Sequence, residues 1–250
     1  MERALIASIF LLATSSLLCA SSRPPSPIII IDPGHGGKDP GARAHHTKEK
    51  DLVLSFSKKL AQSLKKKVKA QVFLTRSNDV FIPLEKRDEI ANQRQCDLFL
   101  SVHANASKSR QAQGIELYYL NRATDRASEK LANRENEYAP QKLDSSEKIL
   151  SDLLQAAATE ESAELSGIMK ASLKNLRKKY SVKKIETKTA LFYVLVGAKC
   201  PSLLMEVGFL TNPEEVRRLK RPKFQKDFAE TVADAIARYL EGRTKSHRDL

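Results

Sequence analysis

The sequence predicts an α/β protein, a single domain with a mixed, mostly parallel sheet of about six strands flanked by helices. Three observations support this prediction. The chain has 250 residues, 41% of them hydrophobic, which is enough for one domain with a substantial core. Short apolar runs alternate along the chain with longer segments of helical periodicity. Several of these runs are continuously apolar, as is typical of strands buried on both faces of a parallel sheet.

Residues 1–22 have the pattern of an export signal. Arg3 supplies a weakly positive start, an apolar stretch runs from Ala4 to Leu18, and small residues follow at Ala20–Ser22. The apolar stretch is shorter than the roughly 20 residues of a membrane-spanning helix. We therefore predict a cleaved signal, no permanent transmembrane anchor, and an exported, periplasmic protein.

Cys19 raises the alternative of a lipoprotein, which the bulky Leu18 before it disfavours. A proline-rich linker is expected at residues 23–27. The main domain is then predicted over residues 28–242, followed by a polar tail at residues 243–250.

The first strand is predicted at Ile28–Ile31, four consecutive isoleucines that end in the turn DPGHGG at residues 32–37. Proline fixes φ and glycine permits positive φ, so the chain turns sharply there. The turn delivers His35 to the carboxyl end of a core strand, where open α/β sheets place their ligands. The sequence therefore marks His35 as a candidate functional residue.

The remaining elements follow from periodicity and from turn residues. Strands are predicted at Val72–Leu74, Leu98–Val102, Gly114–Leu120, Ala190–Leu195 and Ser202–Val207. Helices are predicted at Glu49–Lys66, Pro83–Gln95, Ser145–Glu164, Ser166–Lys179, Pro213–Arg221 and Phe224–Leu240. The polar stretch 122–180 is mostly helical in tendency, with a loop expected at Asn133–Asp144.

The chain is strongly basic. It has 43 Lys+Arg against 30 Asp+Glu, a net charge of +13, which favours anionic partners such as nucleic acid, an acidic membrane surface or a carboxylate-rich polymer. Aromatic–basic interleaving, RNA-binding signatures and zinc-finger spacing are all absent, so no nucleic-acid partner is expected. The basic runs Lys174–Lys184 and Arg217–Lys223 could hold anionic wall precursors or membrane, and a solvated face is the preferred interpretation of each.

Cys96 and Cys200 would remain after export, and each precedes an apolar run, so both are expected at the amino ends of strands. An oxidising compartment permits a disulfide between them. The sequence does not supply their Cα separation, and two buried thiols are the slightly preferred interpretation.

Polar residues at strand ends suggest a metal site. His35 and His103 each follow a core strand, and Glu206 lies near the carboxyl end of another. Two histidines and a carboxylate form a catalytic zinc set that leaves one position for water, and a second carboxylate is needed to move the proton. Glu49 and Glu206 are both available, and spacing alone does not assign their roles. His46 and Glu49 form an alternative ligand pair, and ordinary polar residues remain the other alternative.

Several sequence blocks occur together in one order. They are IDPGHGG at 31–37, DPGA at 39–42, EKDL at 49–52, TR at 75–76, residues 87–92, DLFLSVHAN at 97–105 and PSLLMEVGFLTN at 201–212. In this combination the chain resembles the zinc-dependent N-acetylmuramoyl-L-alanine amidases of the type 3 family, the cell-division amidases that cut peptidoglycan. The blocks cover nearly all of residues 28–240.

The resemblance implies a role for each motif residue. His35, Glu49 and His103 become the Zn²⁺ ligands and Glu206 the catalytic carboxylate, while His45 and His46 become loop residues. The implied reaction is hydrolysis of the amide between N-acetylmuramic acid and L-alanine, in peptidoglycan or its lipid-linked precursor. Cell-wall remodelling or cell division is the implied role.

Some members of this family hold an inhibitory helix over the zinc and are switched on by a protein activator. Residues 121–165 occupy the corresponding place here and contain Glu135, Glu137 and Asp144, carboxylates that could block a metal site. Their spacing does not establish such a block.

The sequence also contains patterns that bear on two other functions. Ser145-x-x-Lys148, Ser55-x-x-Lys58 and Ser63-x-x-Lys66 match the serine–lysine pattern of penicillin-binding enzymes, which would allow an additional D,D-carboxypeptidase activity. The Ser-Asp-Asn element is missing, and such matches arise by chance in a chain rich in serine and lysine. A non-catalytic wall-binding protein would need a broken site, whereas all four motif positions are intact.

Overall fold

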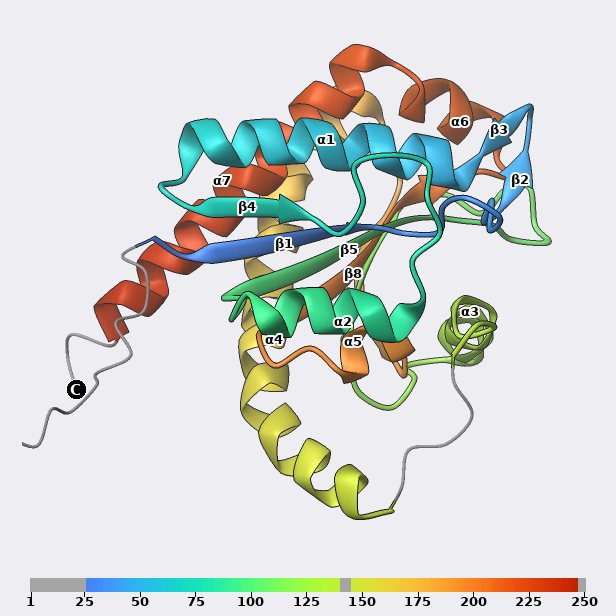
Figure 1. The fold of residues 1–250 in the computed structure, drawn as a ribbon. Helices are drawn as coiled ribbons and strands as arrows, with labels where there is room; N and C mark the ends of the chain where they lie inside the picture. The colour runs from blue at the N-terminus through green and yellow to red at the C-terminus, as the bar shows by residue number, and fades with distance from the viewer. Residues whose placement is uncertain (1–25, 140–144, 247–250) are drawn as a thin grey trace, which may run out of the picture.

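The computed structural model describes residues 26–139 and 145–246, without the side chains of 145–157 and 244–246 (Figure 1). Its strands are β1 (Ile28–Pro33), β2 (Arg43–Ala44), β3 (Thr47–Lys48), β4 (Gln71–Leu74), β5 (Leu98–Asn105), β6 (Ile115–Leu120), β7 (Ile185–Ala190) and β8 (Ser202–Phe209). Its helices are α1 (Glu49–Lys67), α2 (Leu84–Gln93), α3 (Arg126–Glu135), α4 (Ser145–Tyr180), α5 (Tyr193–Val196), α6 (Pro213–Leu219) and α7 (Pro222–Ser246).

One six-stranded sheet has the order β4-β1-β5-β8-β6-β7. The strands β4, β1, β5 and β8 are parallel, β6 pairs with β8 in the antiparallel direction, and β7 is parallel to β6. The predicted fold class, a mixed and mostly parallel sheet, is confirmed. Because β1, β5 and β8 are parallel neighbours, their carboxyl ends meet at one edge of the sheet.

Helices cover both faces of this sheet, with α1 above it and α2 below it in Figure 1. The core on one face takes side chains from α1, α4 and α7, and the core on the other face takes side chains from α2, α3 and α5. β1 and β5 are buried along their whole length, as the isoleucine run of β1 and the mainly apolar start of β5 predicted.

Four predicted boundaries are wrong. The loop expected at Asn133–Asp144 starts later, because α3 continues to Glu135. A strand was predicted at Ala190–Leu195, but the strand in this region is β7, which ends at Ala190. Tyr193–Val196 forms the short helix α5 instead. β7 is an edge strand, so most of its side chains stay partly exposed, whereas Val194 and Leu195 belong to the buried core.

The other two boundaries concern the long helices. Ser145–Tyr180 is one helix rather than two. The last helix does not end at Leu240 but continues to Ser246, where Arg243 donates to Glu161 at 3.2 Å and to the Asp97 carbonyl at 3.3 Å.

Cys96 and Cys200 form a disulfide with a Cα–Cα distance of 5.9 Å. The preference for two buried thiols was wrong, because it could not take account of strand register. β5 and β8 are parallel neighbours with Phe99 opposite Ser202, which brings the residues just before both strands within bonding distance. The predicted position of both cysteines at the amino ends of strands is confirmed.

The predicted signal at residues 1–22 lies outside the described residues. Within the described part of the chain, no helix combines the length and the apolar character that a membrane span requires.

A buried acid on α2 makes stability depend on pH. Asp88 is 5% exposed, and its Oδ1 has no hydrogen-bond partner within the described residues. Burial, with a smaller repulsion from Asp32, raises the pKa of Asp88 to about 8. The unfolded chain releases this proton from about pH 4 upward while the folded chain keeps it, so stability falls as the pH rises from about 4 to about 8.

Asp88→Asn is therefore expected to raise the free energy of unfolding by about 2 kcal/mol at pH 7 and to change it little at pH 4. The amide does not ionise, so folding at pH 7 no longer has to bind the proton that the buried Asp88 carboxyl group requires. Thermal melts of both proteins at the two pH values measure the effect. Glu85→Gln, an exposed acid on the same helix, is the matched control. An Asp88→Asn melting curve that keeps the wild-type pH dependence would contradict this assignment.

Candidate active site

Asp32, near the end of β1, anchors the turn that follows this strand and is fully buried. Its carboxylate accepts hydrogen bonds from Thr75 Oγ1 at 2.5 Å, Arg87 Nη1 at 2.7 Å and Ser101 Oγ at 2.8 Å. Burial opposes the charge, but Arg87 and the two hydroxyls outweigh it and lower the pKa of Asp32. A charged anchor therefore connects β1 with β5, with the segment after β4 and with α2.

Two arginines hold the backbone of the same turn. Arg76 donates to the carbonyls of Pro33 at 2.9 Å and Gly34 at 2.7 Å. Arg87 donates to the carbonyls of Pro33 and His35, both at 2.9 Å. These contacts satisfy carbonyl groups that a non-repetitive turn leaves without secondary-structure partners. The turn is therefore rigid, although its backbone is irregular.

Glycine is required at position 34 because the chain passes close to His103. A Cβ built at Gly34 would lie 2.4 Å from the His103 ring. At Gly41, where φ is +61°, a Cβ would lie 2.6 Å from Glu49 Oε2 and also 2.6 Å from the His35 ring. The backbone therefore packs directly against the side chains of the site on two sides.

His35, Glu49 and His103 converge at the carboxyl edge of the sheet. One ligand atom from each lies within 4.8 Å of the others. Glu49 Oε1 is 3.1 Å from His35 Nε2 and 3.1 Å from His103 Nδ1. The three residues come from the turn after β1, the first position of α1 and the end of β5. His35 and His103, which strand ends predicted to lie together, do so in the structure, and Glu49 joins them from the start of α1.

Backbone and side-chain contacts fix the orientation of these groups. Glu49 accepts from the Ala42 amide at 2.8 Å and from the Ala104 amide at 2.9 Å. His35 Nδ1 lies 2.7 Å from Asp39 Oδ2, which leaves Nε2 directed into the cluster. Such a carboxylate–histidine contact holds the orientation of an imidazole that binds a metal. His35 Nε2 is buried and makes no well-oriented hydrogen bond within the described residues, although two carboxylates lie near it.

The electrostatics of the cluster are dominated by opposite charges in a buried space. Burial opposes ionisation of Glu49, but His35 and His103 lower its pKa to about 2. Burial also opposes the charge on His103, but Glu135 and Glu49 raise its pKa to about 9. The site therefore has a strong preference for positive charge between its carboxylates.

Glu206 lies beside this cluster. It stands opposite His103 in the β5–β8 register and is fully buried. Both of its carboxylate oxygens are without hydrogen-bond partners among the described residues. Burial, together with Glu49 and Glu135, raises its pKa well above the usual value for a carboxyl group, against the opposing effect of His103. A buried carboxyl group with a raised pKa is suited to taking up and releasing a proton near neutrality.

Glu135 blocks the site. Its Oε2 lies 3.3 Å from His35 Nε2 and 3.3 Å from His103 Nδ1, and its side chain is 5% exposed. The cavity that remains, which Tyr138 also lines, has a volume of about 20 Å³. That volume holds one water molecule or ion, whereas ligand sites usually offer about 300 Å³ or more. No glycan or peptide enters the site in this state.

Several contacts hold α3 in the blocking position. Its N-cap, Asp125, lies 3.5 Å from Lys188 Nζ on β7. Arg134 donates to the Ala106 carbonyl at 3.0 Å. Asn136 donates to the Leu191 carbonyl at 2.7 Å and accepts from the Tyr193 amide at 2.7 Å. Figure 1 shows α3 at the end of the sheet toward which β1 and β5 run.

The other candidates from the sequence lie elsewhere. His45 and His46 are exposed in the β2–β3 hairpin, away from the cluster. Glu137 is exposed, and Asp144 lies outside the described residues. Ser55 donates to Gln225 on the helical layer, and the side chain of Ser145 is not described.

Sequence reasoning missed the residues that support the site. Asp39 had a usable signal, because it lies in the DPGA block four positions after His35. Arg76 and Arg87 also lie in the quoted blocks, although their contacts with carbonyls of the turn could not be inferred. The side-chain contacts of Arg134 and Asn136 with the rim had no sequence signal.

Comparisons with known proteins agree on one family. The model of the family described as "Amidase_3: N-acetylmuramoyl-L-alanine amidase" matches residues 29–238. The N-acetylmuramoyl-L-alanine amidase AmiC of Escherichia coli O6:H1 is 35% identical over 233 residues. This match covers 88% of the present chain and 55% of AmiC, so the chain spans about half the length of that relative.

Solved structures agree. An N-acetylmuramoyl-L-alanine amidase from Clostridium difficile 630 has a TM-score of 0.67 at 30% identity, covering 86% of this chain and 97% of that one. The CwlD amidase from Clostridioides difficile, solved in complex with the GerS lipoprotein, has a TM-score of 0.66 at 25% identity, covering 86% and 99%.

Proposed function

This chain belongs to the type 3 N-acetylmuramoyl-L-alanine amidase family, and on that premise we propose that it hydrolyses the amide between N-acetylmuramic acid and L-alanine in peptidoglycan. The observation that carries the proposal is the convergence of His35, Glu49 and His103 beside the buried Glu206. Cell-wall remodelling or cell division is the role we propose for this activity.

The residues fit a zinc ion. Two imidazoles and a carboxylate are a donor set that catalytic zinc takes, with one further position open. The buried, poorly hydrogen-bonded His35 Nε2 and the negative surroundings of the cluster both support a cation there. We therefore propose His35, Glu49 and His103 as the zinc ligands. Zinc bound to them would supply Lewis-acid chemistry, polarising the scissile carbonyl and lowering the pKa of a water molecule.

Glu206 performs the proton transfers in the proposed reaction. Its carboxylate takes a proton from the attacking water and gives it to the nitrogen of the departing L-alanine. Asp39 keeps the His35 ring in orientation through Nδ1. Glu49 is in turn held by the amides of Ala42 and Ala104, so the ligands are organised before substrate arrives.

The described state is proposed to be the inactive form of the enzyme. Glu135 occupies the space between the two histidines that substrate and solvent would need, and the remaining cavity is too small for a stem peptide. Opening requires α3 to move away. A protein activator is the proposed trigger, and the complex of CwlD with a lipoprotein supports this kind of partner.

We also propose that the protein is exported to the periplasm after cleavage near residues 20–22. Export would bring it to peptidoglycan, the proposed substrate, and to lipid-linked precursor on the outer face of the membrane. The catalytic domain is proposed to be residues 28–242, which contain the matched family region.

In a Glu135→Ala background, which removes the blocking carboxylate, chelation is expected to abolish release of stem peptides from purified peptidoglycan, and added zinc should restore it. Metal analysis should find about one zinc per chain in the wild type and little in His35→Ala. His45→Ala is the matched control, because His45 is an exposed histidine outside the cluster. Product masses show which bond is cut: an amidase releases peptides that begin with L-alanine, whereas a carboxypeptidase releases D-alanine. Full activity without metal would contradict the zinc mechanism.

A further inference from the structure

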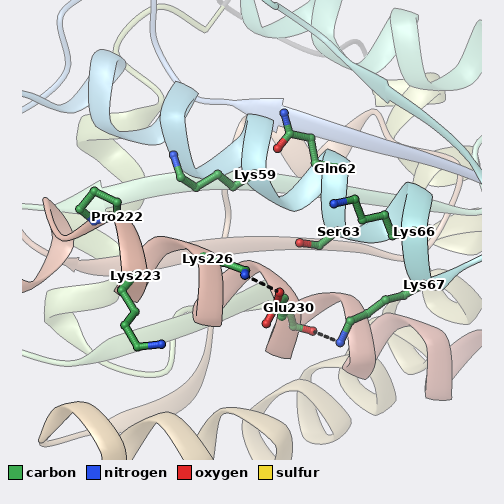
Figure 2. Close-up of a pocket in the computed structure, with 9 residues that line it drawn as sticks. All are labelled: Lys59, Gln62, Ser63, Lys66, Lys67, Pro222, Lys223, Lys226 and Glu230. Carbon is green, nitrogen blue, oxygen red and sulfur yellow. Dashed lines mark hydrogen bonds and ion pairs between the residues drawn. The ribbon is translucent and has the colours of Figure 1, made fainter.

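A groove of about 420 Å³ lies between α1 and α7, away from the active site (Figure 2). Its residues are Lys59, Gln62, Ser63, Lys66 and Lys67 from α1, and Pro222, Lys223, Lys226 and Glu230 from α7. The first of them, Lys59, comes ten residues after Glu49 on α1, about 15 Å along the helix axis. The groove is thus a part of the helical layer and separate from the catalytic rim.

The lysines from α1 are only partly neutralised. Among the described residues, Lys66 has no carboxylate partner, and Lys59 contacts only the Ser55 hydroxyl, at 3.3 Å. Lys67 is paired with Asp234 at 2.6 Å. In Figure 2 the dashed lines reach Lys67 and Lys226 and leave the other three lysines without one.

The lysines from α7 have weak partners. Lys226 lies 3.9 Å from Glu230. Lys223 lies 3.8 Å from Asp227, which already accepts closer contacts from Lys179 and from the Tyr180 hydroxyl. One lining carboxylate therefore faces five ammonium groups, and the concave shape concentrates their positive potential.

This arrangement suits phosphate. Lysine binds phosphate as a point charge, and the Ser63 hydroxyl and Gln62 amide can add hydrogen bonds. Further exposed basic residues lie next in sequence to residues that line the groove, namely Lys58, Lys65, Lys220 and Arg221. The charged face is therefore wider than a single small anion and matches an extended phosphate surface.

We propose that the groove binds phosphate headgroups of an anionic phospholipid membrane and holds the α1–α7 face against it. The binding is electrostatic, because α1 and α7 carry no exposed large hydrophobic side chain within the described residues. The groove shares no lining residue with the catalytic cluster, so contact of this face with a membrane does not itself cover His35, Glu49 or His103.

Vesicle sedimentation of the purified full-length protein tests the proposal. We expect binding to phosphatidylglycerol vesicles, weaker binding to phosphatidylcholine vesicles, and loss of the difference at high salt. The combined variant Lys59→Gln, Lys66→Gln and Lys223→Gln should bind about 100-fold more weakly, at about fivefold for each lysine near an anionic surface. All proteins share the same N-terminal segment, so differences among them report the groove.

The matched control removes three exposed lysines outside the groove: Lys86→Gln, Lys183→Gln and Lys199→Gln. Equal weakening in both triple variants would overturn the proposal, because net charge would then explain the binding. If the groove triple variant melts early, the double variant Lys66→Gln and Lys223→Gln, at two exposed positions, replaces it with an expected loss of about 25-fold.

Two further measurements distinguish a lipid headgroup from free phosphate, and a membrane from the wall polymer. Inorganic phosphate should compete with the vesicles through the same lysines, whereas groove-dependent binding of inorganic phosphate without groove-dependent sedimentation on anionic vesicles would assign the groove to a free anion and overturn the lipid assignment. Groove-dependent sedimentation with purified peptidoglycan but not with anionic vesicles would overturn it in favour of the wall polymer. Equal binding to both kinds of vesicle would also overturn it.

Discussion

Replacing Glu206 with glutamine is expected to lower kcat about 10³-fold, because the amide cannot take the proton from water or return it to the departing amine. Metal content should stay at the wild-type value, since Glu206 is not one of the three clustered ligands. The fold should also persist. Glu206 is buried without hydrogen-bond partners among the described residues, and a neutral amide of the same shape adds no charge there.

The measurement is initial-rate release of stem peptides from labelled peptidoglycan, together with metal analysis and a thermal melt. Glu186→Gln is the matched control, the same chemical change on the edge strand β7. Both changes are best measured again in a Glu135→Ala background, so that blocking of the site does not hide the chemistry. A Glu206→Gln enzyme that kept its zinc and its wild-type kcat would remove Glu206 from the mechanism.

Replacing Glu135 with alanine is expected to raise activity about 10- to 100-fold in the absence of any activator. The change removes the carboxylate that lies 3.3 Å from both histidines and the partner of Arg134 at 3.0 Å. Loss of these contacts destabilises the closed state, in which α3 covers the site, relative to the open state. The fraction of molecules with an open site therefore grows. Peptidoglycan digestion at matched zinc occupancy measures the gain.

Glu137→Ala is the control for this change, because Glu137 follows α3 and is exposed. Glu135→Gln tests charge separately, since it retains the shape of the side chain and should give a smaller gain than alanine. If Glu135→Ala had the same low activity as the wild type, the carboxylate would not be the block, and the closed state would need another explanation.

The candidate site was largely predictable because its residues sit at the ends of core strands. The isoleucine run of β1 and the apolar run of β5 are local patterns, and parallel strands bring their carboxyl ends to one edge. His35 and His103 therefore met as predicted. The position of Glu49 at the first residue of α1 also followed from local helical periodicity.

The sequence did not show which acid of the segment would lie over the metal site. Glu135, Glu137 and Asp144 looked alike as acids in a polar segment. Glu135 reaches the histidines because α3 packs Leu131 and Ala132 into the core, which sets the rotation of the helix. In a helix of 3.6 residues per turn, successive side chains point about 100° apart. An error of one residue in the expected orientation of α3 would therefore select a different acid.

The sequence by itself therefore determined the fold class, the strand ends that carry His35, His103 and Glu206, and the family. The tertiary structure decided the Cys96–Cys200 disulfide, the block by Glu135 and the groove between α1 and α7. The physical reason is that periodicity and turn chemistry act between near neighbours in the chain, whereas these three features join segments brought together only by strand register and helix packing.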